Sequence, residues 1–454
     1  MNTHNSKAGE CAAAERVPLS GKLGYGIGDF ANNLVFQTVT LFMLFFFTDV
    51  FLLGASAAGI IFFAAKVWNA VCDPAVGYIA DRTTTRWGRN RPFLLLGPLP
   101  LGISFLLLFA APRLGETGRV AYALVTFLVF STAYSVVTVP YNALTANLTL
   151  DCDERSSITG YKMTFAILGT LLTAGATKPV VALFPTQVDG FRAIGAIFGI
   201  IYALVYIVTF ASVRENTWSP QEEGKSLKED LRLVFQNGPF LVLNLACILI
   251  MVAVNIMAAM VNYYFKYNLS AEPYIPAAFL CLFITAMVAM PLWVFVSSRL
   301  GKKPAFLAGS AVLISALAAL FLLPHAGITV ILIVFVLGGV GMSTIYLCPW
   351  SMVPDTVEYS EWKSGLRREG ILYGFFNFTF KFSSAFSGML AGIGLDLVRY
   401  MPNARQADTT LFGMRVMMTI IPVAFILIGM LVLHRYTIDA AFHRKIVGEI
   451  RARA

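Results

Sequence analysis

Polar side chains recur at helical spacing inside an apolar stretch near residue 70. Lys66, Asn69 and Asp73 lie at i, i+3 and i+7, which places them on one face of a helix. Cys72 lies beside Asn69 on the same stripe. A carboxylate in an apolar environment needs a cation, a basic partner or a proton. Asp73 is therefore predicted to bind a coupling cation or proton, and a structural ion pair between Lys66 and Asp73 is the alternative.

A further polar stripe combines hydroxyl and amide groups. Ser135, Thr138 and Asn142 also follow the i, i+3, i+7 spacing. Their oxygens could ligate a cation or bind a substrate. The hydroxyls could equally donate to the backbone of their own helix, as Ser and Thr often do.

Two lysines lie inside apolar stretches further along the chain. Lys381 lies in the middle of its stretch, too far from either end for its ammonium to reach the membrane surface easily. We expect it to pair with an acidic side chain or a substrate oxygen. Lys162 lies nearer the start of its stretch, so reaching the surface is an alternative to binding substrate.

Aromatic and amide side chains accompany these lysines. Tyr25, Asp29 and Asn33 share one helical face, and Asn255 and Asn262 share another. Amides beside aromatic rings suit the binding of a sugar ring, whereas tyrosines near the membrane surface often serve only as anchors. These five residues are predicted to bind substrate.

The composition shows what must position these groups. Of the 454 residues, 57% are hydrophobic and 13% are charged. Soluble domains carry about 25% charged residues, so this chain has too little polar surface to face water, and the bilayer must be its main solvent. The net charge of +9 comes mostly from short loops between apolar stretches, which is a positive-inside pattern and not a nucleic-acid-binding face. The four histidines form no catalytic cluster, so we expect a transporter and not an enzyme.

The apolar stretches predict the fold class. A spanning helix needs roughly 20 mainly apolar residues, and the chain supplies twelve such stretches. We therefore predict an all-α membrane protein with twelve transmembrane helices. The predicted spans are Gly24–Thr48, Ala57–Ala80, Phe93–Ala111, Val120–Leu148, Thr159–Phe184, Phe191–Val213, Pro239–Tyr267, Tyr274–Val296, Pro304–Leu323, Ile328–Met352, Gly370–Leu397 and Phe412–His434.

Basic loops predict the orientation and the domain organisation. Lys and Arg gather after the second, sixth and eighth spans and in the C-terminal tail, so these segments and both termini are predicted to be cytoplasmic, in the inner membrane. Similar basic loops at 81–92 and 298–304 lie six spans apart, which predicts two six-helix halves of the major facilitator fold. The predicted regions are a cytoplasmic tail (1–22), an N-terminal half (23–213), a cytoplasmic linker (214–238), a C-terminal half (239–436) and a cytoplasmic tail (437–454).

Several motifs in both halves resemble one family. They are KLGYGIGD at 22–29, WNAVCDP at 68–74, RWGR at 86–89 with the preceding Asp81, and DTVEYSEW at 355–362. They are similar to those of the glycoside–pentoside–hexuronide:cation symporters, the family of the sodium/melibiose symporter, within the major facilitator superfamily. The similarity runs from about residue 22 to residue 436. It implies a symporter whose central site binds a sugar and a coupling cation.

The resemblance implies a cation site with fewer carboxylates than the family pattern. The second of the family's two span-two aspartates matches Asp73, and the first falls at Asn69. The family's cation-site asparagine falls at Cys72, its span-four hydroxyl ligand matches Ser135, and its span-four aspartate falls at Thr138. The positions are kept, but most of the negative charge is not.

The implied sugar site keeps its basic residues. The family's stacking tryptophan falls at Asn142 and its span-one aspartate at Asn33. Its span-five arginine matches Lys162, and its span-eleven lysine matches Lys381. Because these lysines lack the carboxylates that surround them in the family, we expect an anionic substrate to bind better than a neutral one.

Further resemblances concern gating and substrate type. Six charged residues within and near these motifs resemble the family's cytoplasmic gating network, namely Arg82, Arg86, Arg89, Asp355, Glu361 and Arg367. The stretches 161–163 and 348–355 also resemble lysophospholipid symporters of the same superfamily, which keeps an amphipathic anion as the alternative substrate.

The coupling ion follows from the ligands that remain. Sodium needs several hard oxygen ligands, and a thiol such as that of Cys72 is a poor one. A single buried carboxylate suits a proton, because burial disfavours its charged form. We therefore predict symport of a sugar, glycoside or sugar acid with H⁺, favoured over Na⁺. No cofactor beyond the coupling ion is expected, and the partners are the substrate, that ion and the bilayer, with the protein a monomer.

Overall fold

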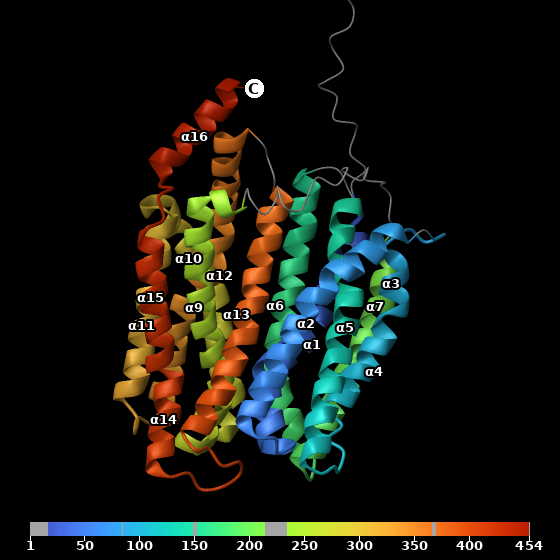
Figure 1. The fold of residues 1–454 in the computed structure, drawn as a ribbon, viewed down its shortest axis with the longest axis vertical. Helices are drawn as coiled ribbons and strands as arrows, with labels where there is room; N and C mark the ends of the chain where they lie inside the picture. The colour runs from blue at the N-terminus through green and yellow to red at the C-terminus, as the bar shows by residue number, and fades with distance from the viewer. Residues whose placement is uncertain (1–16, 84, 149–151, 214–233, 366–368, 454) are drawn as a thin grey trace, which may run out of the picture.

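The protein is a bundle of long, roughly parallel helices (Figure 1). The computed structural model describes residues 17–83, 85–148, 152–213, 234–365 and 369–453. The first group of elements is α1 (Leu19–Phe45), the π-helical turn η1 (Phe46–Val50), α2 (Ala55–Arg82), α3 (Arg91–Leu96), α4 (Pro98–Leu108), α5 (Glu116–Leu148), α6 (Cys152–Ala182) and α7 (Gln187–Ser212).

The second group follows residue 234. It comprises α9 (Gly238–Tyr263), η2 (Tyr264–Asn268), η3 (Glu272–Tyr274), α10 (Ile275–Leu300), α11 (Lys302–Leu322), α12 (Ile328–Ser364), α13 (Glu369–Leu397), α14 (Asp408–Met418), α15 (Ile420–His434) and α16 (Ala440–Arg453).

Ten helical segments of the described chain are long and apolar enough to cross a membrane. The other two predicted spans coincide with α3–α4 and with α13, which carries Lys381. The α3–α4 span is interrupted at Gly97 because Pro98 has no N–H to donate to the preceding turn. An all-helical chain with these segments matches the predicted fold class.

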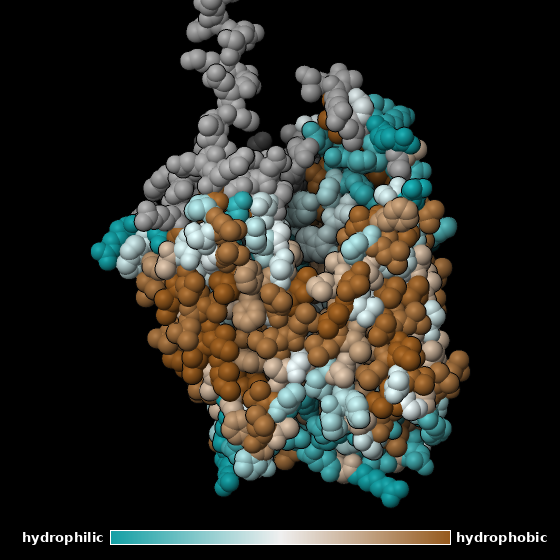
Figure 2. Space-filling model, turned by 180° about the vertical axis from the view of Figure 1, so that it is seen from behind, coloured by the Kyte–Doolittle hydropathy of each residue, from teal (hydrophilic) through white to brown (hydrophobic). Residues whose placement is uncertain are grey.

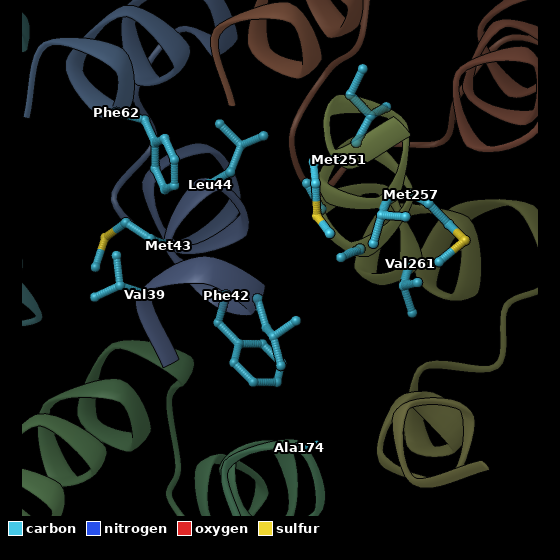
Figure 3. Close-up of a cluster of buried hydrophobic side chains, with 14 of the residues drawn as sticks. Val39, Phe42, Met43, Leu44, Phe62, Ala174, Met251, Met257 and Val261 are labelled. Carbon is cyan, nitrogen blue, oxygen red and sulfur yellow. The ribbon is translucent and has the colours of Figure 1, made fainter. Parts of the chain in front are cut away.

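The two groups of helices, called the first half and the second half from here on, each pack internally and then against each other. Within the first group α1 packs on α6 and α7, and within the second α9 packs on α13 and α15. The groups meet along α2 with α13, α6 with α10 and α1 with α9. Figure 3 shows buried apolar side chains of α1 (Phe42, Leu44) and of α9 (Met257, Val261) in this part of the core.

The α2–α13 contact is closest at three glycines. A Cβ on Gly392 would lie 2.4 Å from the carbonyl oxygen of Ala55 and 2.8 Å from the Cα of Gly59, and a Cβ on Gly388 would lie 2.4 Å from the Phe62 ring. Small residues let two helices approach to backbone contact, as is common between membrane helices. These glycines therefore join the two groups along one part of the interface.

The surface has the character of a membrane protein. Figure 2 shows an apolar belt around the middle of the bundle and hydrophilic side chains at both ends. Large apolar side chains such as Ile60, Val71 and Leu204 are exposed in the belt. We call the end at which α1 begins and α16 lies the termini end, and the end at which α1 passes into η1 the opposite end (Figure 1).

Candidate functional site

An ion pair joins the two halves within the spanning region. Lys381 of α13 donates to Asp73 of α2 in a very short contact. The side chains are 37% and 23% exposed, so the pair borders accessible space and is not sealed in the core. The Asp73 carboxylate thus has a basic partner, Lys381, which lies 308 positions away in the chain and belongs to the other half.

A chain of hydrogen bonds orients the carboxylate. The buried Ser135 hydroxyl of α5 donates to Asp73 Oδ1 at 2.7 Å. That hydroxyl accepts from Asn69 Nδ2 at 2.8 Å, and the same amide donates to the backbone oxygen of Ser131 at 3.2 Å. The structure therefore brings together Asp73, Asn69 and Ser135 of the predicted cation site, with the Lys381 ammonium in contact with the carboxylate.

Two other residues of the predicted cation site make contacts elsewhere. Cys72 Sγ lies 3.9 Å from the hydroxyl of Thr132. The Thr138 hydroxyl donates to the backbone oxygen of Tyr134 at 2.8 Å, the local bond that the sequence left open. Neither side chain is hydrogen-bonded to Asp73, so in this conformation the carboxylate has few oxygen ligands around it.

Lys66 does not form the alternative ion pair with Asp73. Its ammonium lies 4.3 Å from the centre of the Phe36 ring and 5.4 Å from that of Phe62. The side chain is 8% exposed. Aromatic faces, and not the neighbouring carboxylate, therefore surround this cation.

Predicted substrate residues gather around Lys162 of α6. Its ammonium donates to Asn142 Oδ1 at 2.6 Å and lies 5.1 Å from the centre of the Tyr141 ring. Asp29 of α1 lies close enough to attract it electrostatically, and the Asn33 amide donates to the backbone oxygen of Asp29 at 2.9 Å. Asn142 is exposed, so this group borders accessible space.

Three other residues predicted to bind substrate donate hydrogen bonds to backbone oxygens in this structure. Tyr25 is fully buried, and its hydroxyl donates to the backbone oxygen of Tyr141 at 2.7 Å. Asn262 is also fully buried, and its amide donates to the Leu41 carbonyl of the other half at 2.6 Å. Asn255 donates to its own helix and lines a small pocket between the halves. In this conformation Tyr25 and Asn262 join helices and are closed to a ligand.

The opposite end is held by a buried carboxylate. Asp49 of η1 is 3% exposed and accepts from Lys266 Nζ at 2.7 Å. The hydroxyls of Tyr267 and Tyr400 donate to it in short contacts, and the Asn403 amide donates to its backbone oxygen at 2.7 Å. Burial and the Asp49 carboxylate both raise the pKa of Tyr400, so this hydroxyl keeps its proton and remains a donor. Each of these partners comes from the other half.

An ion pair between a buried lysine and a partly exposed glutamate lies at the same end. Lys178 of α6 is 7% exposed and lies 2.8 Å from Glu272 of the other half. Its ammonium also lies 3.8 Å from the centre of the Phe45 ring. Nearby, the hydroxyls of Thr48 and Tyr263 are 2.7 Å apart across the interface. The opposite end is thus closed by several polar contacts between the halves.

Of the predicted gating residues, Arg82, Arg86 and Asp355 lie at the termini end, and the contacts given below for them stay within their own half. The guanidinium groups of Arg82 and Arg86 are exposed and lie over the rings of Tyr78 and Trp87, beside them in the chain. Asp355 accepts from Lys302 at 2.7 and 2.8 Å, within the second half. The remaining members are placed as follows: Arg89 lies in the loop before α3, Glu361 lies near the end of α12, and Arg367 is outside the described residues.

One group of potential metal ligands lies near Asp355. Ligand atoms of Asp355, Glu358 and His443 lie within 4.8 Å of one another. Lys302 already donates to both oxygens of Asp355, and His443 is in short contact with Glu358. The contact of His443 with Glu358 docks α16 onto α12.

The sequence family settles the class of protein. A family model described as MFS/sugar transport protein matches residues 24–440. The chain belongs to this family. It is therefore a membrane transporter of the sugar transport class and not an enzyme.

Relatives and solved structures agree with this assignment. The chain is 33% identical to an uncharacterized symporter, YnaJ, of Bacillus subtilis (strain 168), over 97% of this chain and 96% of the relative. It is 30% identical to a putative sulfoquinovose importer of Salmonella typhimurium, over 92% and 89% of the two chains. A bacterial homologue of the lysosomal transporter Spinster shares the fold, with a TM-score of 0.69 at 14% identity over 94% of this chain and 97% of that chain.

Reasoning from the sequence missed several residues of this interface. Asp49 and Lys266 lie at span ends, where charges are ordinary, and only the fold brings them together. Lys178 could have been found, because it is a further lysine within the predicted fifth span. Away from the interface, Lys302 was noted only as part of a basic loop, and it is the partner of Asp355 within the second half.

Proposed function

We propose that the protein is a proton-coupled symporter that brings a sugar, a glycoside or a sugar acid into the cell by alternating access. The observation that carries the proposal is the Asp73–Lys381 pair, a contact between the two halves. Its side chains border accessible space, so a coupling ion and a substrate can reach them. The basic loops and tails gather at the termini end, which we assign to the cytoplasm.

The pair suggests how a proton couples to movement. With Asp73 charged, Lys381 binds it and holds α13 to α2. A proton on Asp73 removes this attraction and frees the Lys381 ammonium. The freed cation can then bind a substrate oxygen, so proton binding and substrate binding favour each other.

The ligands around Asp73 favour a proton over sodium. The carboxylate has one hydroxyl neighbour, Ser135, whose proton it accepts. The adjacent Asn69 presents its N–H₂ to Ser135 and to the backbone, which leaves no amide oxygen directed at Asp73. Replacing the hydration shell of sodium takes several oxygens, whereas a proton needs only one.

The relatives support a sugar-type substrate. Sulfoquinovose, the substrate in the name of one relative, is a sugar that carries an anionic sulfonate. The Lys162, Asn142 and Asp29 group offers donors and acceptors that suit sugar hydroxyls.

The test is transport by the purified protein in liposomes. A panel of labelled glucose, xylose, glucuronate, sulfoquinovose and a lysophospholipid first identifies a substrate by exchange. We expect a pH gradient to drive its accumulation without sodium. Asp73→Asn should abolish accumulation and keep exchange, because the neutral side chain mimics the protonated carrier. Accumulation that follows a sodium gradient and ignores pH would contradict proton coupling, and accumulation by Asp73→Asn would show that Asp73 is not the carrier.

A further inference from the structure

Lys66 is a buried cation with no anion beside it among the described residues. It is 8% exposed, and its ammonium lies over the rings of Phe36 and Phe62. In the part of the chain that the structure describes, no carboxylate lies within ion-pair distance of it. A cation–π contact stabilises an ammonium by about 2 kcal/mol when desolvated, whereas burying an ion costs several kcal/mol.

The other lysines that lie at the contact between the halves show what is missing. Lys178, 7% exposed, also lies over a phenylalanine ring, and it has Glu272 at 2.8 Å. Lys266 has Asp49 at 2.7 Å, and Lys381 has Asp73. Among the described residues, Lys66 therefore resembles Lys178 in lying over phenylalanine rings, but it has no carboxylate partner.

The position of Lys66 places it beside the proposed transport site. It shares a face of α2 with Asn69 and Asp73, two turns from the ion pair. Lys381 is close enough to repel it electrostatically. Phe62, under the ammonium, also lines the pocket between the halves that includes Asn255 and Ser384.

The local charge balance calls for an anion. When both lysines are protonated, Lys66 and Lys381 together carry two positive charges, and Asp73 supplies one negative charge. A proton on Asp73 leaves both ammonium groups uncompensated. A neutral sugar hydroxyl cannot balance that charge, whereas a carboxylate or sulfonate can.

We propose that Lys66 is a substrate-binding residue that binds the acid group of an anionic sugar, with Phe36 and Phe62 holding its ammonium in place. The inference rests on the proposed sugar transport and adds the residue that selects the charge of the substrate. Truncating one member of a buried charge pair leaves the other charge buried and unpaired. Loss of the Lys66 ammonium should therefore weaken the binding of acidic sugars by about 30-fold or more.

Binding to the purified full-length protein tests this, at constant pH and sodium and with no gradient. The probes are matched sugars, glucuronate against glucose and sulfoquinovose against glucose, measured by calorimetry. We expect the wild type to bind the acidic member more tightly. Lys66→Met should remove that preference, and Lys66→Arg should retain it. Lys178→Met is the matched control: it removes a buried lysine over a phenylalanine ring and should not change the preference.

The outcomes separate the two proposals. Equal binding of acidic and neutral sugars by the wild type, or an acidic preference that survives in Lys66→Met, overturns the role of Lys66 and leaves sugar transport intact. Binding of neither member of any pair overturns the proposed sugar class, and the role of Lys66 falls with it. The result does not depend on which ion couples transport, because no gradient is present. Thermal melting of each variant shows that it is folded.

Discussion

The two ends of the bundle differ in how the halves are joined. At the opposite end Asp49 accepts from Lys266, Tyr267 and Tyr400, all from the other half. At the termini end the polar contacts described, such as Lys302 with Asp355, stay within one half. Figure 2 shows a recess between the two groups of helices at the termini end. The structure is thus an inward-facing conformation on the orientation proposed here, with buried charge closing one end.

This difference indicates which contacts stabilise the observed conformation. A buried ion pair is stable only while both partners are present, since removing one leaves an uncompensated buried charge. Exposed arginines over neighbouring rings contribute little. Substitutions at the opposite end should therefore shift the conformational equilibrium, and substitutions of exposed groups at the termini end should not.

The largest effect is expected from Asp49→Ala. The change leaves Lys266 buried without its carboxylate, at a cost of about 3–5 kcal/mol to the inward-facing state. Spin labels on Leu52→Cys and Met401→Cys, exposed side chains of the two halves at this end, should move apart. The control is Asp189→Asn, which removes an exposed carboxylate paired with Arg192 within one half at the same end. Unchanged label distances in Asp49→Ala would contradict a closing role.

A somewhat smaller effect is expected from Gly392→Val. The new side chain would meet the Ala55 oxygen 2.4 Å from its Cβ and would push α13 from α2, at a cost of about 1–3 kcal/mol. Label distances should increase as for Asp49→Ala. Gly374→Val on the same helix, where a Cβ meets nothing within 4 Å, is the matched control. If both variants behave alike, the close approach of the helices does not matter for closure.

Lys302→Met tests a contact at the termini end. It breaks a pair with the buried Asp355 inside the second half. We expect a loss of thermal stability of about 1–3 kcal/mol and no change in label distances. A change in distances without a loss of stability would show that this contact also controls the conformation.

The smallest effect is expected from Arg86→Gln. Its guanidinium is exposed and lies over the neighbouring Trp87 ring, so stability should stay within about 0.5 kcal/mol. The role in gating predicted for Arg86 belongs to a conformation in which the termini end is closed. Slower transport with unchanged inward-facing stability would fit that role. A large loss of melting temperature would contradict it.

Spans and local stripes were predictable, but partners across the interface were not. Hydropathy located the helices, and the Gly97-Pro98 pair explains the interrupted third span. Helical spacing placed Asn69 and Asp73 on one face, the family resemblance predicted Ser135 beside them, and in the structure hydrogen bonds join the three. Such spacing describes a single helix, so it could not decide whether Lys66 or Lys381 would pair with Asp73.

The roles of the buried amide and hydroxyl groups also needed the structure. Thr138 and Asn255 donate to their own helices, a choice that depends on which face each helix presents. Asp49 lies at the end of a span, where a charge is ordinary, and becomes notable only because η2 and the loop before α14 surround it. The site assignments remain predictions that the proposed variants test.

The Asp73–Lys381 pair has a consequence for membrane voltage. In the empty carrier the two side chains neutralise each other. In the loaded carrier, on the proposals above, one proton enters together with one monoanionic sugar. Moving a charge against 100 mV changes the free energy by about 2.3 kcal/mol. With Lys66 charged, the site carries the same net charge in the empty and in the loaded carrier, so a complete cycle moves no net charge. Accumulation of an acidic sugar should then follow the pH gradient alone, whereas a neutral sugar carried with a proton would generate a current.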